Sequence, residues 1–486
     1  SYSLLNLLYN EKGMDGIKFA PPKLCLKRFG GRLSIENYRK SKQEEYFYPA
    51  AVPRWYSKPY ELTLQGSNNS IINLTNSKIE DKNFYNKGAI DIVSGRHLIR
   101  DFETNNRQNS VSIRKTPENF DLRIKSDLST NSFLKIQNTE GDLELLKNLC
   151  DTPGVPGVED EIAKIVFKNI SSLCFSHEVD PMGNHIFQVN NKIEGAPTIL
   201  VDAHMDEVGF LVSNIEANGM LRVISLGGID PKLFYGQRLT IWGKKNVEST
   251  VAAIPPHISG KNDSVTQVED CLIDTGLSVK EVLKLIKIGD QVTFSTKCEI
   301  GFDRVISKAL DDRVGLFVLI ESVKALAKKK LNCNFFVSAS VQEEMGLRGA
   351  RIINSRVNPD FSIALEGTVS NDLVGVPQYK SLANLDNGPE IRISDKYLIA
   401  DRKLNSFIEG LAKKKKIPYQ LTAKNAGGTN STAFQVTGNG SKATVLSVPV
   451  RYLHSPSSIC KIKDIKNTIK LLTEIISKIN TFQNAK

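Results

Sequence analysis

The chain has few cysteines and no long hydrophobic run. Its seven cysteines are odd in number, far apart and never in a C-x-x-C pair. This argues against a disulfide framework and a thiolate zinc site, and is typical of a reducing compartment. No apolar run approaches the ~20 residues that a membrane span needs, and the first residues do not form a secretory signal. We therefore expect a soluble protein with no membrane partner, in the cytoplasm or alternatively in an organelle.

Basic residues outnumber acidic ones, and the excess lies in the N-terminal part. The net charge is +11, and residues 1–140 hold 22 Lys and Arg against 15 Asp and Glu, or +7, which leaves +4 for the longer remainder. Such an excess permits contact with nucleic acid, a ribonucleoprotein or another acidic surface. A solvated Lys- and Arg-rich extension is the simpler interpretation.

The length and the changing texture of the chain predict several domains. A chain of 486 residues exceeds the usual size of a single core. Residues 1–140 are rich in Asn, Ser, Lys and Arg with little sustained periodicity, and we predict an extension that is partly disordered or ordered by a partner. Helical and strand patterns alternate over residues 141–206 and 304–486. Residues 207–303 show short alternating stretches separated by turn residues, typical of a small β-rich insertion.

Four near-continuous apolar runs lead into acidic or histidine residues. The runs 198–203, 334–342, 361–365 and 443–450 lead into His204-Met205-Asp206, Glu343-Glu344, Glu366 and His454, respectively. Such runs are typical of strands buried on both faces, as in a parallel sheet with helices on either side, so the predicted fold class is α/β. Ligands of open α/β sheets collect outside the carboxyl ends of the strands. The sequence therefore predicts a site where these residues meet.

The residue types at these ends predict a pair of metal ions. His, Asp and Glu without Cys are typical ligands of a hydrolytic zinc, cobalt or manganese centre. Two ions about 3.5–4 Å apart need one carboxylate that reaches both, and a further carboxylate and an imidazole for each. Asp311, in the pair Asp311-Asp312, is the natural bridge. His204 and Glu366 would hold one ion. Glu344 and His454 would hold the other.

Two further carboxylates complete the predicted site. Adjacent side chains on a strand point in opposite directions, so Glu343 can act as general base on bound water while Glu344 binds metal. Asp206 can orient the imidazole of His204 and fix its tautomer. Taken singly, each cluster has a plainer interpretation: a surface pair for Glu-Glu, a helix cap for Asp-Asp, a core or surface residue for a lone His. These do not explain four strands that all lead to ligand-type residues in a chain with six histidines.

These stretches resemble the dinuclear metallo-aminopeptidases of the tetrahedral type, which include the glutamyl and deblocking aminopeptidases. The similarity covers about seventy per cent of the chain and is carried by the segments 203–209, 308–315, 341–350, 365–368 and 448–455. It implies a zinc-exopeptidase-like sandwich of helices around a mixed, largely parallel sheet, interrupted by the small β-rich domain. It also implies that the catalytic carboxylates are Glu343 and Asp206 and that the metal ligands are His204, Asp311, Glu344, Glu366 and His454.

The resemblance has one departure and an implication for assembly. Family members usually carry Asp where this chain has Asn430, and loss of that charge would alter substrate preference or local packing. Members form dimers and hollow dodecamers, so the resemblance implies a homo-oligomer with residues 207–303 in the contacts. The extension 1–140 has no counterpart in the family.

We predict a metal-dependent aminopeptidase that removes N-terminal residues from peptides, with two divalent ions per chain, zinc or cobalt before manganese. The alternative is a peptidase-like structural subunit of a larger, ribonucleoprotein-type assembly, anchored by residues 1–140. A third hypothesis, an amidase or deacylase, follows because related two-metal sites cleave acyl-amino acids.

Overall fold

The computed structural model describes residues 139–253, 267–380 and 382–483 and, before them, short strands between Arg28 and Ile136. The chain divides into two compact units, Ser1–Asp142 and Leu143–Lys486. In the first unit, β1 (Arg28–Phe29) pairs with β2 (Arg32–Leu33). Six more strands form an antiparallel sheet in sequential order, and they are β3 (Glu61–Gln65), β4 (Ile71–Thr75), β5 (Ile90–Val93), β6 (Ser110–Lys115), β7 (Phe120–Lys125) and β8 (Ser132–Ile136). We did not predict these strands, and the expected disorder or partner-dependence of residues 1–140 stays a prediction.

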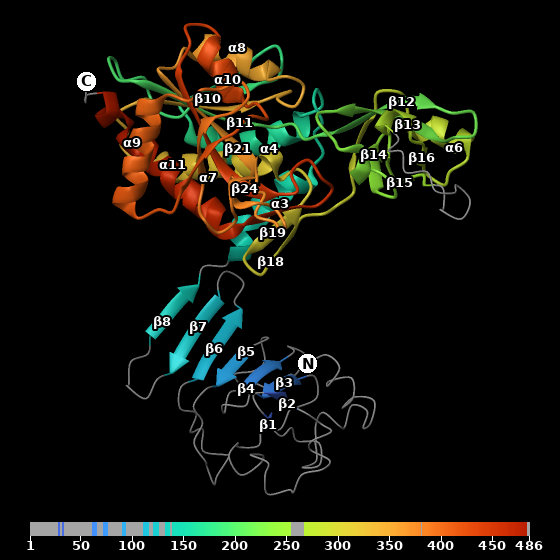
Figure 1. Ribbon diagram of the computed structural model, residues 1–486, viewed down its shortest axis with the longest axis horizontal. Coiled ribbons are helices and arrows are strands. Elements are labelled where there is room, and N and C mark those ends of the chain that lie inside the picture. Colours follow the sequence, from blue (N-terminus) through green and yellow to red (C-terminus); the bar gives the residue numbers. More distant parts are fainter. Residues whose placement is uncertain are drawn as a thin grey trace, which may run out of the picture. The chain divides into compact units, whose positions relative to one another are not determined.

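An eleven-stranded sheet forms the centre of the second unit (Figure 1). Its four middle strands are parallel, in the spatial order β24 (Lys442–Arg451), β21 (Phe361–Val369), β11 (Thr198–His204) and β20 (Asn334–Ser340). These are the four predicted runs, and all four are buried along nearly their whole length. Their carboxyl ends lie at one edge of the sheet, as the sequence predicted.

Antiparallel strands extend the sheet on both sides of this parallel centre. On one side, β10 (His185–Gln188) pairs with β20, and β9 (Ser176–Val179) pairs with β10. On the other side, β25 (Ser458–Lys461) pairs with β24 and continues to β19 (Arg304–Ser307) and β18 (Glu299–Gly301). A branch from β24 consists of β22 (Glu390–Ser394) and β23 (Gln420–Ala423). The sheet is thus mixed and parallel at its centre.

Helices cover both faces of the sheet. One large core holds the helices α3 (Thr139–Asp151), α4 (Asp160–Ile170), α7 (Leu310–Leu326), α9 (Arg402–Lys415) and α11 (Ile462–Gln483). A smaller core on the opposite side holds α8 (Arg348–Val357) and α10 (Asn430–Val436), seen at the top of Figure 1. In α4 the buried residues recur at helical spacing, at Ile162, Ala163, Val166 and Ile170. None of the described helices is long and apolar enough to cross a membrane.

A closed β-barrel is inserted between β11 and β18 and has its own core (Figure 1). Its strands are β12 (Gly209–Ile215), β13 (Leu221–Leu226), β14 (Arg238–Trp242), β15 (Asn246–Val251), β16 (Ile273–Asp274) and β17 (Gln291–Phe294), accompanied by the short helix α6 (Val279–Leu285). Phe210 lies at its centre, 4.9 Å and 5.5 Å between ring centroids from Phe234 and Phe294. The predicted β-rich insertion is therefore confirmed as a small barrel. The predicted domain limits and the role of residues 207–303 in assembly stay predictions.

Candidate metal centre

The carboxylate of Asp311 lies between two imidazoles that come from distant strands. His204 is the last residue of β11, His454 follows β24 by three residues, and Asp311 stands in the first turn of α7. Oδ1 of Asp311 is 3.2 Å from Nε2 of His204, and Oδ2 is 3.1 Å from Nε2 of His454. One carboxylate oxygen thus faces each imidazole, which is the arrangement that a bridging ligand requires.

The other nitrogen of each imidazole meets a backbone carbonyl. Nδ1 of His204 is 3.0 Å from the carbonyl oxygen of Asp206, and Nδ1 of His454 is 2.8 Å from that of Gly228. Because a carbonyl oxygen only accepts, both Nδ1 atoms carry hydrogen and both Nε2 atoms of neutral rings present lone pairs. Lone pairs would then face the carboxylate of Asp311. Such a facing set of acceptors needs a cation or additional protons between its members.

Three glutamates surround this pair of imidazoles. Oε1 of Glu344 is 3.1 Å from Nε2 of His454. Oε2 of Glu366 and Oε2 of Glu343 are 3.7 Å and 4.0 Å from Nε2 of His204. Oε1 of Glu344 and Oε1 of Glu366 are buried without a hydrogen bond in the protein. Buried oxygens of this kind are unusual, and they are the atoms that a metal ion would engage.

The electrostatics of the cluster also favour a cation. Burial raises the pKa of Glu343 and Glu366 well above the usual range, and neighbouring carboxylates raise it further. Burial alone would lower the pKa of His454, but the carboxylates of Glu344 and Asp311 outweigh it and raise that pKa to about 11. These directions all mean that the packed carboxylates draw positive charge into the cluster, which either protons or a metal cation can supply. Its donor set of imidazoles and carboxylates fits divalent zinc, cobalt or manganese.

The predicted ligands come together in space. Ligand atoms of Asp311, Glu344 and His454 lie within 4.8 Å of one another. Ligand atoms of His204 and Glu366 lie equally close together, with Asp312 as the third member of their group. His204 and Glu344 form a further group with Glu343, the predicted general base. Glu366 differs from expectation in one detail, because β21 continues three residues beyond it, so it lies inside a strand rather than after one. The roles of these residues as metal ligands stay predictions.

The sequence left two interpretations open for Asp311-Asp312, a helix cap and a metal ligand, and the two residues differ in their contacts. Oδ1 of Asp312 accepts a hydrogen bond from the backbone N–H of Gly315 at 3.0 Å, which is how a helix cap acts. Asp311 instead faces the imidazoles. Asp312 therefore caps the helix through Oδ1, while its buried Oδ2 has no hydrogen bond and its carboxylate groups with His204 and Glu366. Asp311 is the residue of the pair that faces both imidazoles.

Asp206 holds the segment that carries the two glutamates. Its Oδ1 accepts the N–H of Glu343 and its Oδ2 accepts the N–H of Glu344, both at 3.0 Å. Its Oδ1 is 3.4 Å from Nδ1 of His204, which is nearer the backbone carbonyl of the same aspartate. The side chain was expected to orient the imidazole. Its shorter contacts orient the glutamates.

Asn430 fits this chain because of a buried aspartate on β11. Its Nδ2 donates to Oδ2 of Asp202 at 2.8 Å and lies 2.8 Å from Oγ of Ser340. Asp202 also accepts from the hydroxyls of Ser338 and Ser340. A carboxylate at position 430 would face that of Asp202 with no donor between them. The departure from the family pattern at this position is thus accommodated by local packing.

Several residues that contact the site were not predicted from the sequence. Gly228, in the loop after β13, brings the barrel into contact with His454 through its carbonyl group. Gly227 has φ +84°, and a Cβ there would lie 3.1 Å from Oε2 of Glu344. Glu159 and Asn184 accept hydrogen bonds from the backbone before Glu343. Among these residues, the Gly227-Gly228 pair is the one with a recognisable sequence pattern, since adjacent glycines indicate a turn.

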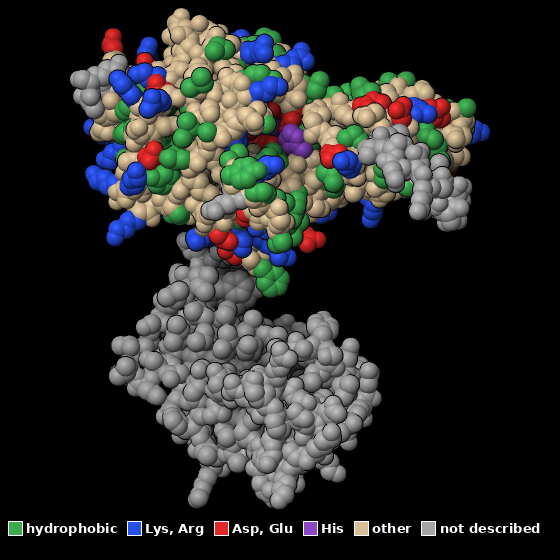
Figure 2. Space-filling model, viewed as in Figure 1, with side chains coloured by type: hydrophobic (Ala, Val, Ile, Leu, Met, Phe, Trp, Pro, Cys, Tyr) green, Lys and Arg blue, Asp and Glu red, His purple; other side chains and the backbone are tan. Residues whose placement is uncertain are grey.

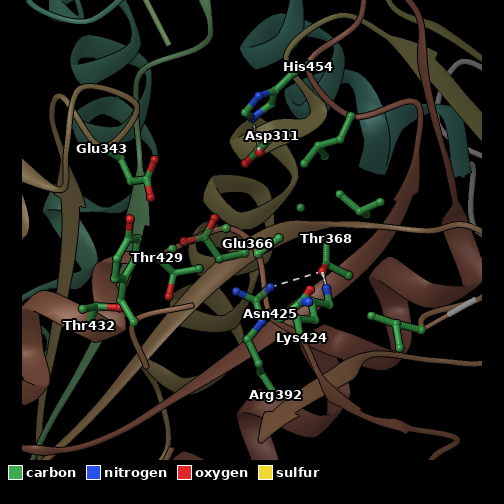
Figure 3. A pocket seen from close by; sticks show the side chains of 18 of the residues that line it. Asp311, Glu343, Glu366, Thr368, Arg392, Lys424, Asn425, Thr429, Thr432 and His454 are labelled. Atoms are coloured by element: carbon green, nitrogen blue, oxygen red, sulfur yellow. Dashed lines mark hydrogen bonds and ion pairs between the residues drawn. The ribbon is translucent and has the colours of Figure 1, made fainter. Parts of the chain in front are cut away.

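A cavity of about 1280 Å³ opens beside the cluster. Figure 2 shows acidic and histidine side chains together in a hollow of the second unit, with hydrophobic side chains next to it. In Figure 3, Asp311 and His454 point toward one another, and Thr368, Arg392 and Lys424 lie beyond Glu366. Arg392 and Lys424 both donate to Oγ1 of Thr368. They are also paired with buried Glu390, so these cations are largely balanced.

Comparison with known proteins agrees with this architecture. The model of the M42 glutamyl aminopeptidase family matches residues 183–471. The lysyl aminopeptidase of Pyrococcus furiosus is 30% identical over 351 residues, which are 70% of this chain and 97% of that protein. The glutamyl aminopeptidase of Lactococcus lactis is 30% identical over 345 residues, 69% of this chain and 96% of that protein.

Solved structures give the same result. The TET1 peptidase of Pyrococcus horikoshii, which can assemble into a tetrahedron or a large octahedral shell, is 32% identical with a TM-score of 0.62. The match covers 69% of this chain and 99% of that one. The family model, the relatives and the solved structure therefore lead to one assignment: the chain belongs to the M42 glutamyl aminopeptidase family, whose activity is that of an aminopeptidase.

Proposed function

We propose that the protein is a dinuclear metallo-aminopeptidase that removes N-terminal residues from short peptides. The observation that carries the proposal is the carboxylate of Asp311, with one oxygen toward His204 and the other toward His454. Glu366 would complete one set of ligands and Glu344 the other. Two divalent cations bound here would acidify water and polarise the scissile carbonyl group. The cavity beside the cluster has room for the peptide.

Glu343 is the proposed general base. Its carboxylate lines the cavity, and its pKa is raised by burial, so it can take a proton from the attacking water at Oε and return it to the nitrogen of the leaving amine. Asp206 keeps this glutamate and Glu344 in place through their backbone N–H groups. The carbonyl group of Gly228 keeps the imidazole of His454 turned so that Nε2 faces Oδ2 of Asp311.

Substitution Glu343→Gln tests the proposal. The amide cannot accept a proton, so we expect kcat on aminoacyl substrates to fall by about 10²- to 10⁴-fold. Metal content should not change, because Glu343 is not one of the proposed ligands. Glu299→Gln, which changes an exposed carboxylate on β18, is the control and should leave both quantities unchanged. An active Glu343→Gln enzyme would reject the general-base role.

The remaining alternatives differ in support. No comparison favours a structural subunit of a ribonucleoprotein, and the converging carboxylates and imidazoles have no use in one. An amidase or deacylase would share the same cluster, so a panel of aminoacyl and acyl-amino-acid substrates separates it from an aminopeptidase.

We also propose that the protein is a homo-oligomer in which the barrel makes contacts, since Leu283 and Ile288 are 63% and 64% exposed there. Particle mass in solution tests this.

A further inference from the structure

The turn that carries Glu343 and Glu344 is held by side chains from three separate segments. It follows β20, and Gln342 within it has φ +55°. Four consecutive backbone N–H groups, those of residues 341–344, donate to side-chain oxygens rather than to other backbone groups. The acceptors are Oδ1 of Asn184 at 2.9 Å, Oε1 of Glu159 at 3.1 Å, and Oδ1 and Oδ2 of Asp206 at 3.0 Å each.

Glu159 is the carboxylate of this set that no part of the proposed chemistry uses. It stands directly before α4, and only 6% of its surface is exposed. Its Oε1 accepts the N–H of Gly157 at 2.8 Å as well as that of Gln342. Among the described residues it forms no ion pair with a Lys or Arg. Residue 159 also lies outside the stretch 183–471 that matches the family model.

Burying a carboxylate costs free energy, even where it accepts hydrogen bonds from two backbone N–H groups. The backbone conformation of Gln342 explains why this carboxylate is buried here. A positive φ at a non-glycine residue is unfavourable by about 1–2 kcal/mol, and the hydrogen bond to Glu159 stabilises the backbone in that conformation. The next residue in the chain is Glu343. A change in the torsions of Gln342 would rotate Glu343 away from the imidazole of His204, 4.0 Å from its Oε2.

We propose that Glu159 is a positioning residue, which fixes the backbone of Gln342 and thereby aims the carboxylate of Glu343 at the reacting water. This inference rests on the proposed general-base role of Glu343. Glu159 acts as a hydrogen-bond acceptor, so its charge is dispensable. An amide oxygen at the same place can accept the same two N–H groups, whereas an apolar side chain of similar size cannot.

The test compares Glu159→Gln with Glu159→Leu in the full chain loaded with zinc or cobalt. We expect the Gln variant to keep nearly full activity. We expect the Leu variant to show kcat lowered by about 100-fold, the size of loss that a displacement near 1 Å can cause, with KM changed little. Glu161→Gln and Glu161→Leu, at a side chain that is 60% exposed on the same helix, are matched controls.

Hydrogen–deuterium exchange gives a reading that does not depend on catalysis. The amide of Gln342 should lose protection in Glu159→Leu and keep it in Glu159→Gln, with the core strands unchanged in both. If the Leu variant does not fold, Glu159→Ala is measured instead. Unchanged kcat and unchanged protection in the Leu or Ala variant would overturn the inference, and so would equal damage in the Gln variant. An active Glu343→Gln enzyme would overturn the proposed function, whereas the exchange of the Gln342 amide tests the contact with Glu159 independently of it.

Discussion

Oδ2 of Asp311 lies 3.1 Å from Nε2 of His454, across a gap of 143 residues in the sequence. The same carboxylate meets His204 through its other oxygen, from a strand on the far side of β21 from β24. Both imidazoles are turned by backbone carbonyls so that their Nε2 atoms face this one group. The carboxylate of Asp311 therefore links the part of the cluster around His204 with the part around His454.

The contact between Asp202 and Asn430 predicts that the carboxylate and the amide can be exchanged between the two positions with little loss of stability. Asn430→Asp would place two buried carboxylates against each other, and we expect a loss of stability of roughly 1–3 kcal/mol or more, because each carboxylate loses a donor. The double variant Asp202→Asn with Asn430→Asp restores one amide against one carboxylate and should recover most of that loss. The free energy of unfolding of the four proteins gives the coupling energy.

Asn332→Asp, at an exposed position in the loop before β20, is the control and should change stability by less than about 0.5 kcal/mol. A double variant that is less stable than either single variant would show that the amide of Asn430 does not serve Asp202.

The contact between the barrel and the cluster predicts sensitivity at Gly227. Alanine there would place Cβ 2.7 Å from Cγ1 of Val208 and 3.1 Å from Oε2 of Glu344, at a φ of +84°. We expect Gly227→Ala to cost about 1–3 kcal/mol of stability and to weaken metal binding, because Glu344 must move. Gly301→Ala has open space around Cβ and serves as the control. Isothermal titration with zinc measures the zinc affinity of both variants. Identical affinities would refute the prediction that Gly227→Ala weakens metal binding.

Glu159 predicts a pH dependence of stability. Burial raises its pKa from the ordinary 4.5 to about 7, against the opposing effect of the hydrogen bond from Gly157. The folded state thus holds this proton more tightly than the unfolded state. The resulting stabilisation is fully present below pH 4.5 and is lost as the pH rises through 7. At pH 8 the loss amounts to about 3 kcal/mol.

Glu159→Gln has no such proton to lose. In metal-free protein, its stability relative to the natural chain should rise between pH 5 and pH 8. Chemical denaturation of both proteins at several pH values measures this difference. A difference that stays constant over the interval would show that the carboxyl group of Glu159 titrates normally.

The centre of the fold and the members of the cluster were predictable because they follow strong local patterns. Buried parallel strands appear as continuous apolar runs, and the ends of such strands meet at one edge. The position of His204 at the end of β11 follows directly from this. In residues 61–136, polar residues alternate with apolar ones, as in Phe120–Lys125, but the surrounding Asn, Ser and Lys concealed the strands.

The supporting contacts could not be predicted, because they join side chains to backbone groups. The carbonyl of Gly228 and the N–H of Gln342 have no residue-specific signal, so neither their partners nor Glu159 could be found from residue types. Asp206 was predicted as a member of the site, but its hydrogen bonds from two backbone N–H groups were not. Sequence patterns predicted side chains that the structure brings together, and the tertiary structure shows which groups orient them.

The metal content of the purified full-length protein tests the central claim most directly. Zinc or cobalt is titrated into metal-free protein, and bound metal is measured by inductively coupled plasma mass spectrometry beside the particle mass. The account predicts two ions per chain, at most one in Asp311→Asn, and two again in Asp303→Asn, an exposed position whose positive φ asparagine tolerates. A protein that binds no divalent metal, or an Asp311→Asn variant that still binds two ions, would contradict it.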